Sequence, residues 1–145
     1  MVQGKGYWVL SYADGMMDMD GTETPVTAQA SNPNCTSVKG CYIIDLTPPS
    51  TAGTSRYNLL GNPFINRVQW SAVRFEVAGV AYTPSAALTA NLVDKQFATY
   101  NGSAYQTCDD VTGGCDAYIK PMQGFWVKLL AGSVGTTVKL LIPKP

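Results

Sequence analysis

Four cysteines are the residues of this chain whose spacing best fits covalent chemistry. They form two local pairs, Cys35 with Cys41 and Cys108 with Cys115, and each pair encloses a polar loop that contains glycine. These spacings are wider than those of zinc-binding cysteine knuckles, and the chain has no histidine to complete another zinc site. We therefore expect two short-loop disulfides and an oxidising compartment, with four reduced thiols in a cytosolic protein as the alternative.

Catalysis is disfavoured by the side chains that are missing. Without histidine, the chain cannot form an ordinary Ser–His or Cys–His pair, and it lacks an imidazole for general acid or base work. A glycosidase that uses two carboxylates remains conceivable, because ten acidic residues are present. Most of these acids are scattered among predicted turns. The sequence therefore predicts a protein that is not an enzyme and that needs no cofactor.

A run of acidic residues near the beginning raises the possibility of a calcium site. Asp14, Asp18, Asp20 and Glu23 offer oxygen ligands. They do not follow the frame of an EF-hand loop, which alternates acids, has glycine at its sixth position and ends with glutamate at its twelfth. The segment is better interpreted as the solvated face of a strand, and calcium binding near residues 14–23 stays open.

Aromatic residues suggest a platform on which flat rings stack against sugars. Successive residues of a strand point to opposite faces, so in Tyr7-Trp8 and in Phe125-Trp126 one ring should enter the core and the other the surface. We take Trp70, Tyr100 and Tyr105 as candidate ligand-binding residues. The competing interpretation is that exposed rings cover another hairpin or an adjacent module.

Charge and hydropathy exclude two kinds of partner. Ten basic and ten acidic residues cancel, and only 14% of residues are charged. We therefore expect no nucleic-acid binding, because no basic field is present, and no membrane insertion, because no apolar run approaches about 18 residues. The first residues do not form a signal peptide, so we expect the chain to be part of a longer secreted or cell-surface parent.

Short β-branched and aromatic segments bounded by glycine, proline, asparagine or aspartate fill the chain and predict an all-β fold. The segment around Asn101-Gly102 predicts a hairpin with a two-residue turn. Only Ser85 to Gln96 could form a helix, of one or two turns, with Ser85 as its cap. Asn62 lies between Gly61 and Pro63, which predicts that a strand ends there and that Phe64 folds back into the core. The predicted strands are Tyr7 to Tyr12, Met16 to Asp20, Cys41 to Leu46, Tyr57 to Leu60, Val73 to Val77, Phe97 to Tyr100, Ala104 to Thr107, Gly124 to Leu130 and Thr137 to Ile142.

A doubled phrase connects the two ends of the chain. Gly-Tyr-Trp-Val begins at Gly6 and Gly-Phe-Trp-Val begins at Gly124, and each is followed by a small polar turn and a second apolar run. We interpret residues 4–25 and 122–145 as related hairpins that close a single domain spanning residues 1–145, although residues 4–25 could instead be the tail of a preceding module. The predicted fold is an antiparallel β-sandwich or flattened barrel, similar to a jelly roll or Greek key, with at most one short helix and with both Gly-aromatic-Trp-Val strands in the core sheet.

Four framework motifs follow one another along the chain: GKGYWV from Gly4, YNLLGNPF from Tyr57, YNGSAY from Tyr100 and PMQGFWV from Pro121. Their order resembles that in β-modules found toward the C-termini of large secreted bacterial surface proteins. The resemblance is carried by four framework motifs and by Trp70, and it departs from the family at Tyr57 and at the two cysteine-closed loops. It implies a secreted β-module and no activity. We expect a non-catalytic structural, spacer or adhesion-type module whose partners are neighbouring modules or a surface glycan, with a carbohydrate-binding module as the alternative.

Overall fold

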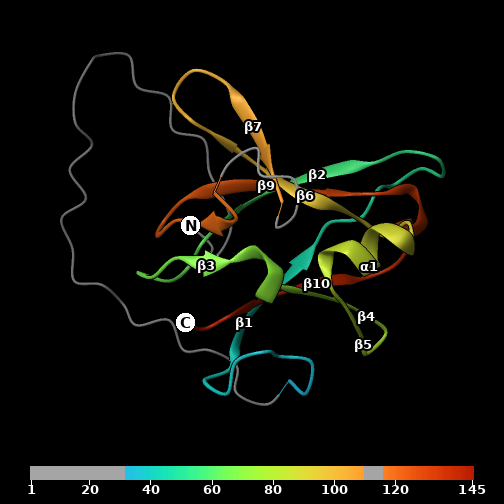
Figure 1. Ribbon diagram of the computed structural model, residues 1–145. Helices are drawn as coiled ribbons and strands as arrows, with labels where there is room; N and C mark the ends of the chain where they lie inside the picture. The colour runs from blue at the N-terminus through green and yellow to red at the C-terminus, as the bar shows by residue number, and fades with distance from the viewer. Residues whose placement is uncertain (1–31, 110–115) are drawn as a thin grey trace.

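A computed structural model describes residues 32–109 and 116–145, and in these residues the chain forms two four-stranded antiparallel sheets and a third sheet of two strands (Figure 1). The predicted strands at residues 7–12 and 16–20, the predicted hairpin at 4–25 and the calcium candidates at 14–23 lie outside the described residues. The first sheet has the order β1 (Cys41–Leu46), β10 (Val138–Pro143), β4 (Arg74–Val77) and β5 (Val80–Tyr82). The second has the order β2 (Arg56–Gly61), β9 (Gly124–Leu129), β6 (Val93–Tyr100) and β7 (Tyr105–Cys108), and β3 (Val68–Gln69) pairs with β8 (Tyr118–Ile119).

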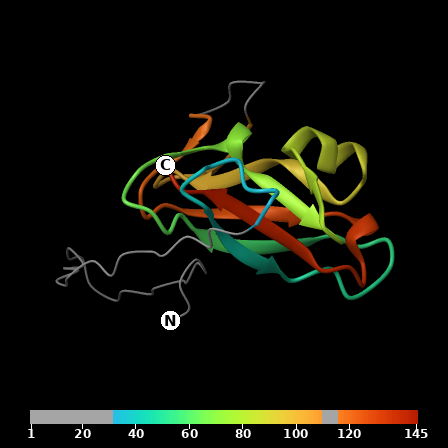
Figure 2. The same ribbon diagram turned by 90° about the horizontal axis from the view of Figure 1, so that it is seen from below.

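This arrangement confirms the predicted fold class. Every strand pair among the described residues is antiparallel, neither large sheet closes into a barrel, and α1 (Pro84–Thr89) is the one α-helix there. Two 3₁₀ turns, η1 (Trp70–Ala72) and η2 (Ala131–Ser133), complete the described elements. The fold is therefore an open β-sandwich, with α1 and η2 at the same end (Figure 2).

The two large sheets share one hydrophobic core. In β9 the side chains of Phe125, Val127 and Leu129 are buried while Trp126 and Lys128 are partly exposed, as strand alternation predicts. β9 is an inner strand of its sheet, which confirms the prediction for the second Gly-aromatic-Trp-Val segment. The rest of this core includes Ile44, Leu46, Leu60, Phe64, Val68, Trp70, Val73, Phe75, Val93, Phe97, Ile119, Val138, Leu140 and Ile142.

The predicted hairpin at residues 122–145 is wrong. Its two strands do form, but β9 pairs with β2 and β6 whereas β10 pairs with β1 and β4, in the other large sheet. The chain changes sheets at η2, where the Gly132 amide donates to the Asn91 carbonyl. A Cβ at Gly132 would lie 2.5 Å from that oxygen, so the close approach requires glycine. The segment is a corner between the sheets rather than a hairpin.

The hairpin around Asn101-Gly102 is confirmed, but its predicted two-residue turn is wrong. Tyr100 pairs with Tyr105, so the loop contains residues 101–104. The Asn101 side-chain oxygen accepts hydrogen bonds from the Ser103 and Ala104 amides at 2.9 Å each, and the Asn101 amide donates to the Ala104 carbonyl. These bonds stabilise a four-residue loop. The predicted two-residue turn needs a positive φ at both Asn101 and Gly102, and only Gly102 has one.

The predicted helix of one or two turns is confirmed, but it starts earlier than Ser85. α1 begins at Pro84, and the Thr83 hydroxyl accepts the Ala86 amide, so Thr83 rather than Ser85 is the N-cap. The helix ends at Thr89, and β6 begins at Val93. The second half of the predicted helical window is therefore strand, because its apolar residues enter the sandwich core.

Candidate functional site

Trp70 lies in the centre of the core, and its interpretation as an exposed sugar-stacking residue is wrong. Its side chain is 0% exposed, and its ring lies 4.8 Å from that of Phe97, measured between centroids. The Trp70 indole Nε1 donates to the Lys95 carbonyl at 2.7 Å, which satisfies the one polar atom of the side chain. Trp70 therefore stabilises the fold and presents no surface to a ligand.

Tyr100 and Tyr105, unlike Trp70, have exposed side chains. They are 54% and 52% exposed, they face each other across the β6–β7 pair, and their ring centroids lie 5.3 Å apart with an interplanar angle of 54°. The hairpin that carries them stands out from the body of the sandwich, at the top of Figure 1. The structure thus brings together two of the three predicted ligand residues, although their rings are tilted rather than coplanar.

A second aromatic group lies on the same outer face of this sheet. Tyr57 is 57% exposed and its ring meets that of Trp126 edge-on, with centroids 6.5 Å apart. The Lys128 ammonium lies 5.7 Å from the centre of the Tyr57 ring. Tyr57 differs from the tyrosines of the β6–β7 hairpin because a cation lies beside its ring, so the two groups can be tested against each other.

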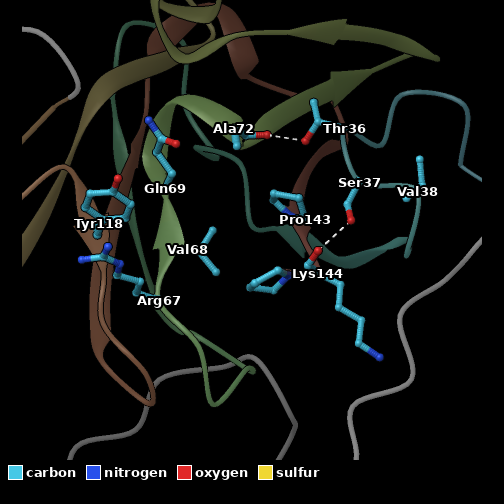
Figure 3. A pocket seen from close by; sticks show the side chains of 11 residues that line it. Thr36, Ser37, Val38, Arg67, Val68, Gln69, Ala72, Tyr118, Pro143 and Lys144 are labelled. Carbon is cyan, nitrogen blue, oxygen red and sulfur yellow. Dashed lines mark hydrogen bonds between the residues drawn. The ribbon is translucent and has the colours of Figure 1, made fainter.

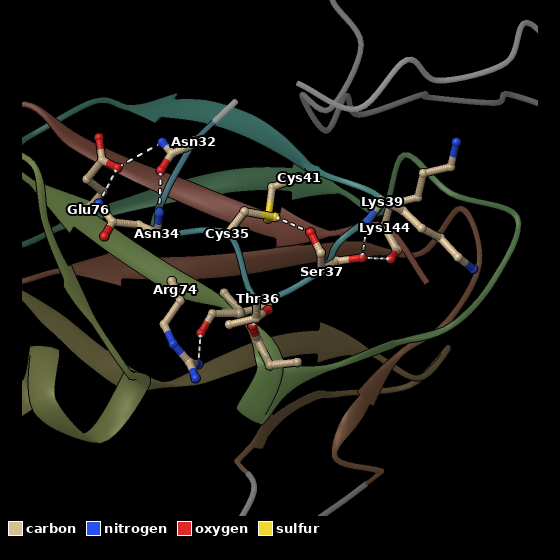
Figure 4. Close-up of a disulfide and its surroundings, with 12 residues drawn as sticks. Asn32, Asn34, Cys35, Thr36, Ser37, Lys39, Cys41, Arg74, Glu76 and Lys144 are labelled. Carbon is tan, nitrogen blue, oxygen red and sulfur yellow. Dashed lines mark hydrogen bonds between the residues drawn. A yellow bond between two sulfur atoms is a disulfide. The ribbon is translucent and has the colours of Figure 1, made fainter. Parts of the chain in front are cut away.

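The Cys35–Cys41 disulfide is present, as predicted (Figure 4). The loop that it closes is fixed to the rest of the molecule, since the Thr36 hydroxyl donates to the Ala72 carbonyl and the Ser37 hydroxyl donates to the Lys144 carbonyl. The predicted partner of Cys108, Cys115, lies outside the described residues; Cys108 itself is buried and disulfide-bonded. The confirmed disulfide attaches this loop to β1.

Glu76 is a buried acid whose carboxylate is held by the segment that precedes the disulfide. The side-chain amides of Asn34 and Asn32 donate to its Oε2 atom at 2.9 and 2.8 Å (Figure 4). The Lys139 ammonium lies 3.9 Å from Oε1. The Asn34 and Asn32 hydrogen bonds lower the pKa of Glu76 below its ordinary value of 4.5, because they favour the charged form. Glu76 is therefore an ionised structural group that connects β4 to this segment.

Asn62, the central residue of the Gly-Asn-Pro-Phe motif, is a buried junction of hydrogen bonds. Its Nδ2 lies 2.9, 3.0 and 3.3 Å from the carbonyl oxygens of Asn66, Lys120 and Ile119, and its Oδ1 accepts the Phe64 amide at 3.0 Å. The glycine and proline around Asn62 predicted the turn and the buried Phe64. They did not predict that the asparagine side chain connects this turn to the segment before β9, because the contact joins residues far apart in sequence.

A shallow depression of about 540 Å³ lies between the disulfide loop and β3 (Figure 3). Arg67 and Lys144 contribute cations to its wall, and the Arg67 guanidinium lies 4.3 Å above the centre of the Tyr118 ring. The Thr36 and Ser37 hydroxyls at this wall already donate to main-chain carbonyls. The depression therefore lacks the paired nucleophile and base that covalent catalysis requires.

The chain was compared with family models, with curated proteins and with solved structures, and any functional assignment rests on the geometry described above. No family model, curated protein or solved structure matches the chain. Within residues 32–109 and 116–145, no three acidic, cysteine or histidine side chains gather where they could hold a metal ion. Over the same residues, no helix has the length and apolarity needed to cross a bilayer.

Proposed function

We propose that the chain is a non-catalytic structural or adhesion-type β-module of a larger secreted or cell-surface bacterial protein. Its role on this proposal is to hold a stable sandwich between neighbouring modules. The proposal excludes an enzymatic role and a bound cofactor.

One observation carries the proposal: the buried polar side chains of the described residues are used inside the fold. The Asn58 side chain accepts a hydrogen bond from the Thr47 amide and donates one to the Thr47 carbonyl. The Ser133 hydroxyl donates to the Leu130 carbonyl at 2.6 Å. Asp109 lies 3.2 Å from the Lys95 ammonium. No buried side-chain nitrogen or oxygen of the described part of the chain lacks a partner. Polar groups committed in this way stabilise a scaffold, whereas a catalytic site needs groups available to the substrate.

The location outside the cytosol is supported by the Cys35–Cys41 disulfide. Disulfides persist in oxidising compartments and are rare in the reducing cytosol. Neutral charge and a surface rich in Ser, Thr, Asn and Gly are consistent with the same location.

The test is to place the full chain between two unrelated reporter domains and export the fusion to a bacterial periplasm. We expect a cooperative unfolding transition whose midpoint is unchanged when the reporter domains are exchanged for another pair. The midpoint should also be unchanged by EDTA, because residues 32–109 and 116–145 form no metal site. We also expect no turnover of a panel of chromogenic esters and glycosides.

Two results would contradict the proposal. One is a midpoint that falls on chelation of metals. The other is hydrolysis that copurifies with the chain and disappears in Glu76→Gln or Asp109→Asn, the variants of the two buried acids found in residues 32–109 and 116–145.

A further inference from the structure

We infer that the outer face of the β6–β7 hairpin binds a neutral pyranose, stacked on the ring of Tyr100 or Tyr105 with the other ring as a side wall. This inference goes beyond the proposed module role, because a module can be structural without binding any glycan.

The first argument is the exposure of two rings at one place. Tyr100 and Tyr105 are each more than half exposed although they form a direct cross-strand pair. Tyrosine supplies a large, rigid contact surface at low entropic cost, with a hydroxyl at its edge. The rings offer to a ligand both an apolar face and a hydrogen-bonding rim, which matches a sugar ring with its C–H face and equatorial hydroxyls.

The second argument is the absence of charge along the part of the hairpin where β6 and β7 pair, residues 97–108. From Gln96 to Cys108 the sequence contains no Asp, Glu, Lys or Arg, although Lys95 and Asp109 stand immediately outside this stretch. An acidic or basic ligand would meet no complementary charge on the paired part of the hairpin, because the charged residues of β6, Asp94 and Lys95, come before it. The chemistry therefore favours a ligand that is uncharged and rich in hydroxyl groups.

The third argument is the row of small side chains beside the rings. Ala98 pairs with Thr107, and each lies two residues from a tyrosine on its own strand. Residues two apart on a strand share a face, so these two side chains lie on the same outer face as the two tyrosine rings. The Ala98 methyl is small and leaves room above the sheet beside the rings. The exposed Thr107 hydroxyl can donate to and accept from sugar hydroxyls. A pyranose stacked on one ring can therefore rest over Ala98 and reach Thr107.

The tilt between the rings limits the length of glycan that fits. A flat, extended chain needs coplanar rings, but these two meet at 54°. The angle suits one sugar residue against one ring, with the second ring as a side wall. We therefore expect recognition of one or two sugar residues, with a dissociation constant on the order of 1 mM.

The experiment is an NMR titration of the full-length chain with the methyl glycosides of glucose, galactose, mannose and xylose, followed by the linear neutral oligomers of any sugar that binds. Amide shifts should centre on residues 98–107. Affinity should stop rising after the disaccharide, and charged trigalacturonate should not bind.

Three variants test the contacts directly. Tyr100→Ala and Tyr105→Ala should each weaken binding by about 3- to 10-fold, the effect of losing one aromatic contact. Thr107→Val, which keeps the shape of the side chain and removes the hydroxyl, should weaken it less. Tyr57→Ala is the matched control, because it removes an equally exposed tyrosine from another part of the same face and should leave the affinity unchanged.

Four results would overturn the inference: no binding of any neutral glycoside at tens of millimolar, binding that survives loss of either hairpin tyrosine, loss of binding only in Tyr57→Ala, or affinity that rises steadily up to a hexasaccharide. Unfolding by urea serves as the check that Tyr100→Ala and Tyr105→Ala remain folded. If both alanine variants unfold, the comparison is made with Tyr100→Leu and Tyr105→Leu, which retain apolar bulk without a ring.

Discussion

Replacing Asn62 with alanine should destabilise the sandwich more than replacing any exposed asparagine. Asn62 is only 4% exposed, and its removal takes the acceptor from the Phe64 amide and a donor from the Asn66 carbonyl, whereas the Lys120 carbonyl keeps the Gln123 amide as a donor. A buried group left unpaired costs about 1–3 kcal/mol, so the Phe64 amide and the Asn66 carbonyl together should lower the free energy of unfolding by about 3 kcal/mol. For a chain of this size the midpoint of thermal unfolding should fall by about 6–12 °C.

The assay is equilibrium unfolding of the oxidised chain in guanidinium chloride, followed by tryptophan fluorescence and by circular dichroism. Asn66→Ala is the matched control, because it changes the same residue type in the same turn, where the side chain is exposed, and should alter stability by less than about 0.5 kcal/mol. Asn62→Asp should be at least as damaging as Asn62→Ala, since a carboxylate would face carbonyl oxygens where the amide now donates. A loss below about 1 kcal/mol in Asn62→Ala, or equal losses at Asn62 and Asn66, would refute the assignment of this side chain as a structural junction.

Three further changes test other parts of the framework. Replacing both cysteines of the 35–41 pair with serine should lower the free energy of unfolding by about 2 kcal/mol, because the bridge closes a short loop in the unfolded chain; equal melting of the variant and the parent would contradict this. Hydrogen bonds from Asn34 and, less strongly, from Asn32 lower the pKa of Glu76 in the folded state. The stability that Glu76 contributes should therefore be fully present above pH 4.5 and be lost as the pH falls through the lower folded-state pKa. Urea unfolding between about pH 3 and 7 should show this dependence in the parent and a flatter one in Glu76→Gln. Gly132→Ala should cost about 1–3 kcal/mol, since its Cβ would meet a main-chain carbonyl at the corner between the sheets, and an unchanged denaturation midpoint would show that the corner can relax.

Most of the longer strands were predictable from sequence because alternation of polar and apolar residues is a local signal. The strands β3, β5 and β8, of two or three residues each, were not predicted. β1 begins and ends at the predicted residues, Cys41 and Leu46, and the inward position of Phe125 follows from the same pattern. The pairing of the strands was not predictable in this way. β10 lies between β1 and β4, and alternation tells which face a residue occupies but not which strand lies beside it. The supposed hairpin at residues 122–145 failed for this reason.

The candidate site divides along a similar line. Trp70 begins a 3₁₀ turn rather than continuing a strand, so neither its neighbours nor their alternation indicated that its ring points inward. Tyr100 and Tyr105 form the last residue pair of β6 and β7 before a recognisable loop. Their side chains are exposed because they lie at this end of the sheet. Sequence therefore identified the aromatic residues, while three-dimensional packing decided which of them can meet a ligand.

The two hairpin tyrosines have a structural role that is independent of any ligand, and its size bears on how the binding data are interpreted. A cross-strand aromatic pair stabilises a sheet by about 0.2–1 kcal/mol, an amount that two β-branched side chains also supply in part. Stability alone therefore gives little reason to place tyrosine at both positions of an exposed hairpin. The surrounding loop is already fixed by the Asn101 side chain, which accepts hydrogen bonds from the Ser103 and Ala104 amides. Since the loop does not depend on the rings, the feature that tyrosine adds at these positions is exposed aromatic surface with hydroxyl groups, which is the property that a glycan-binding role requires.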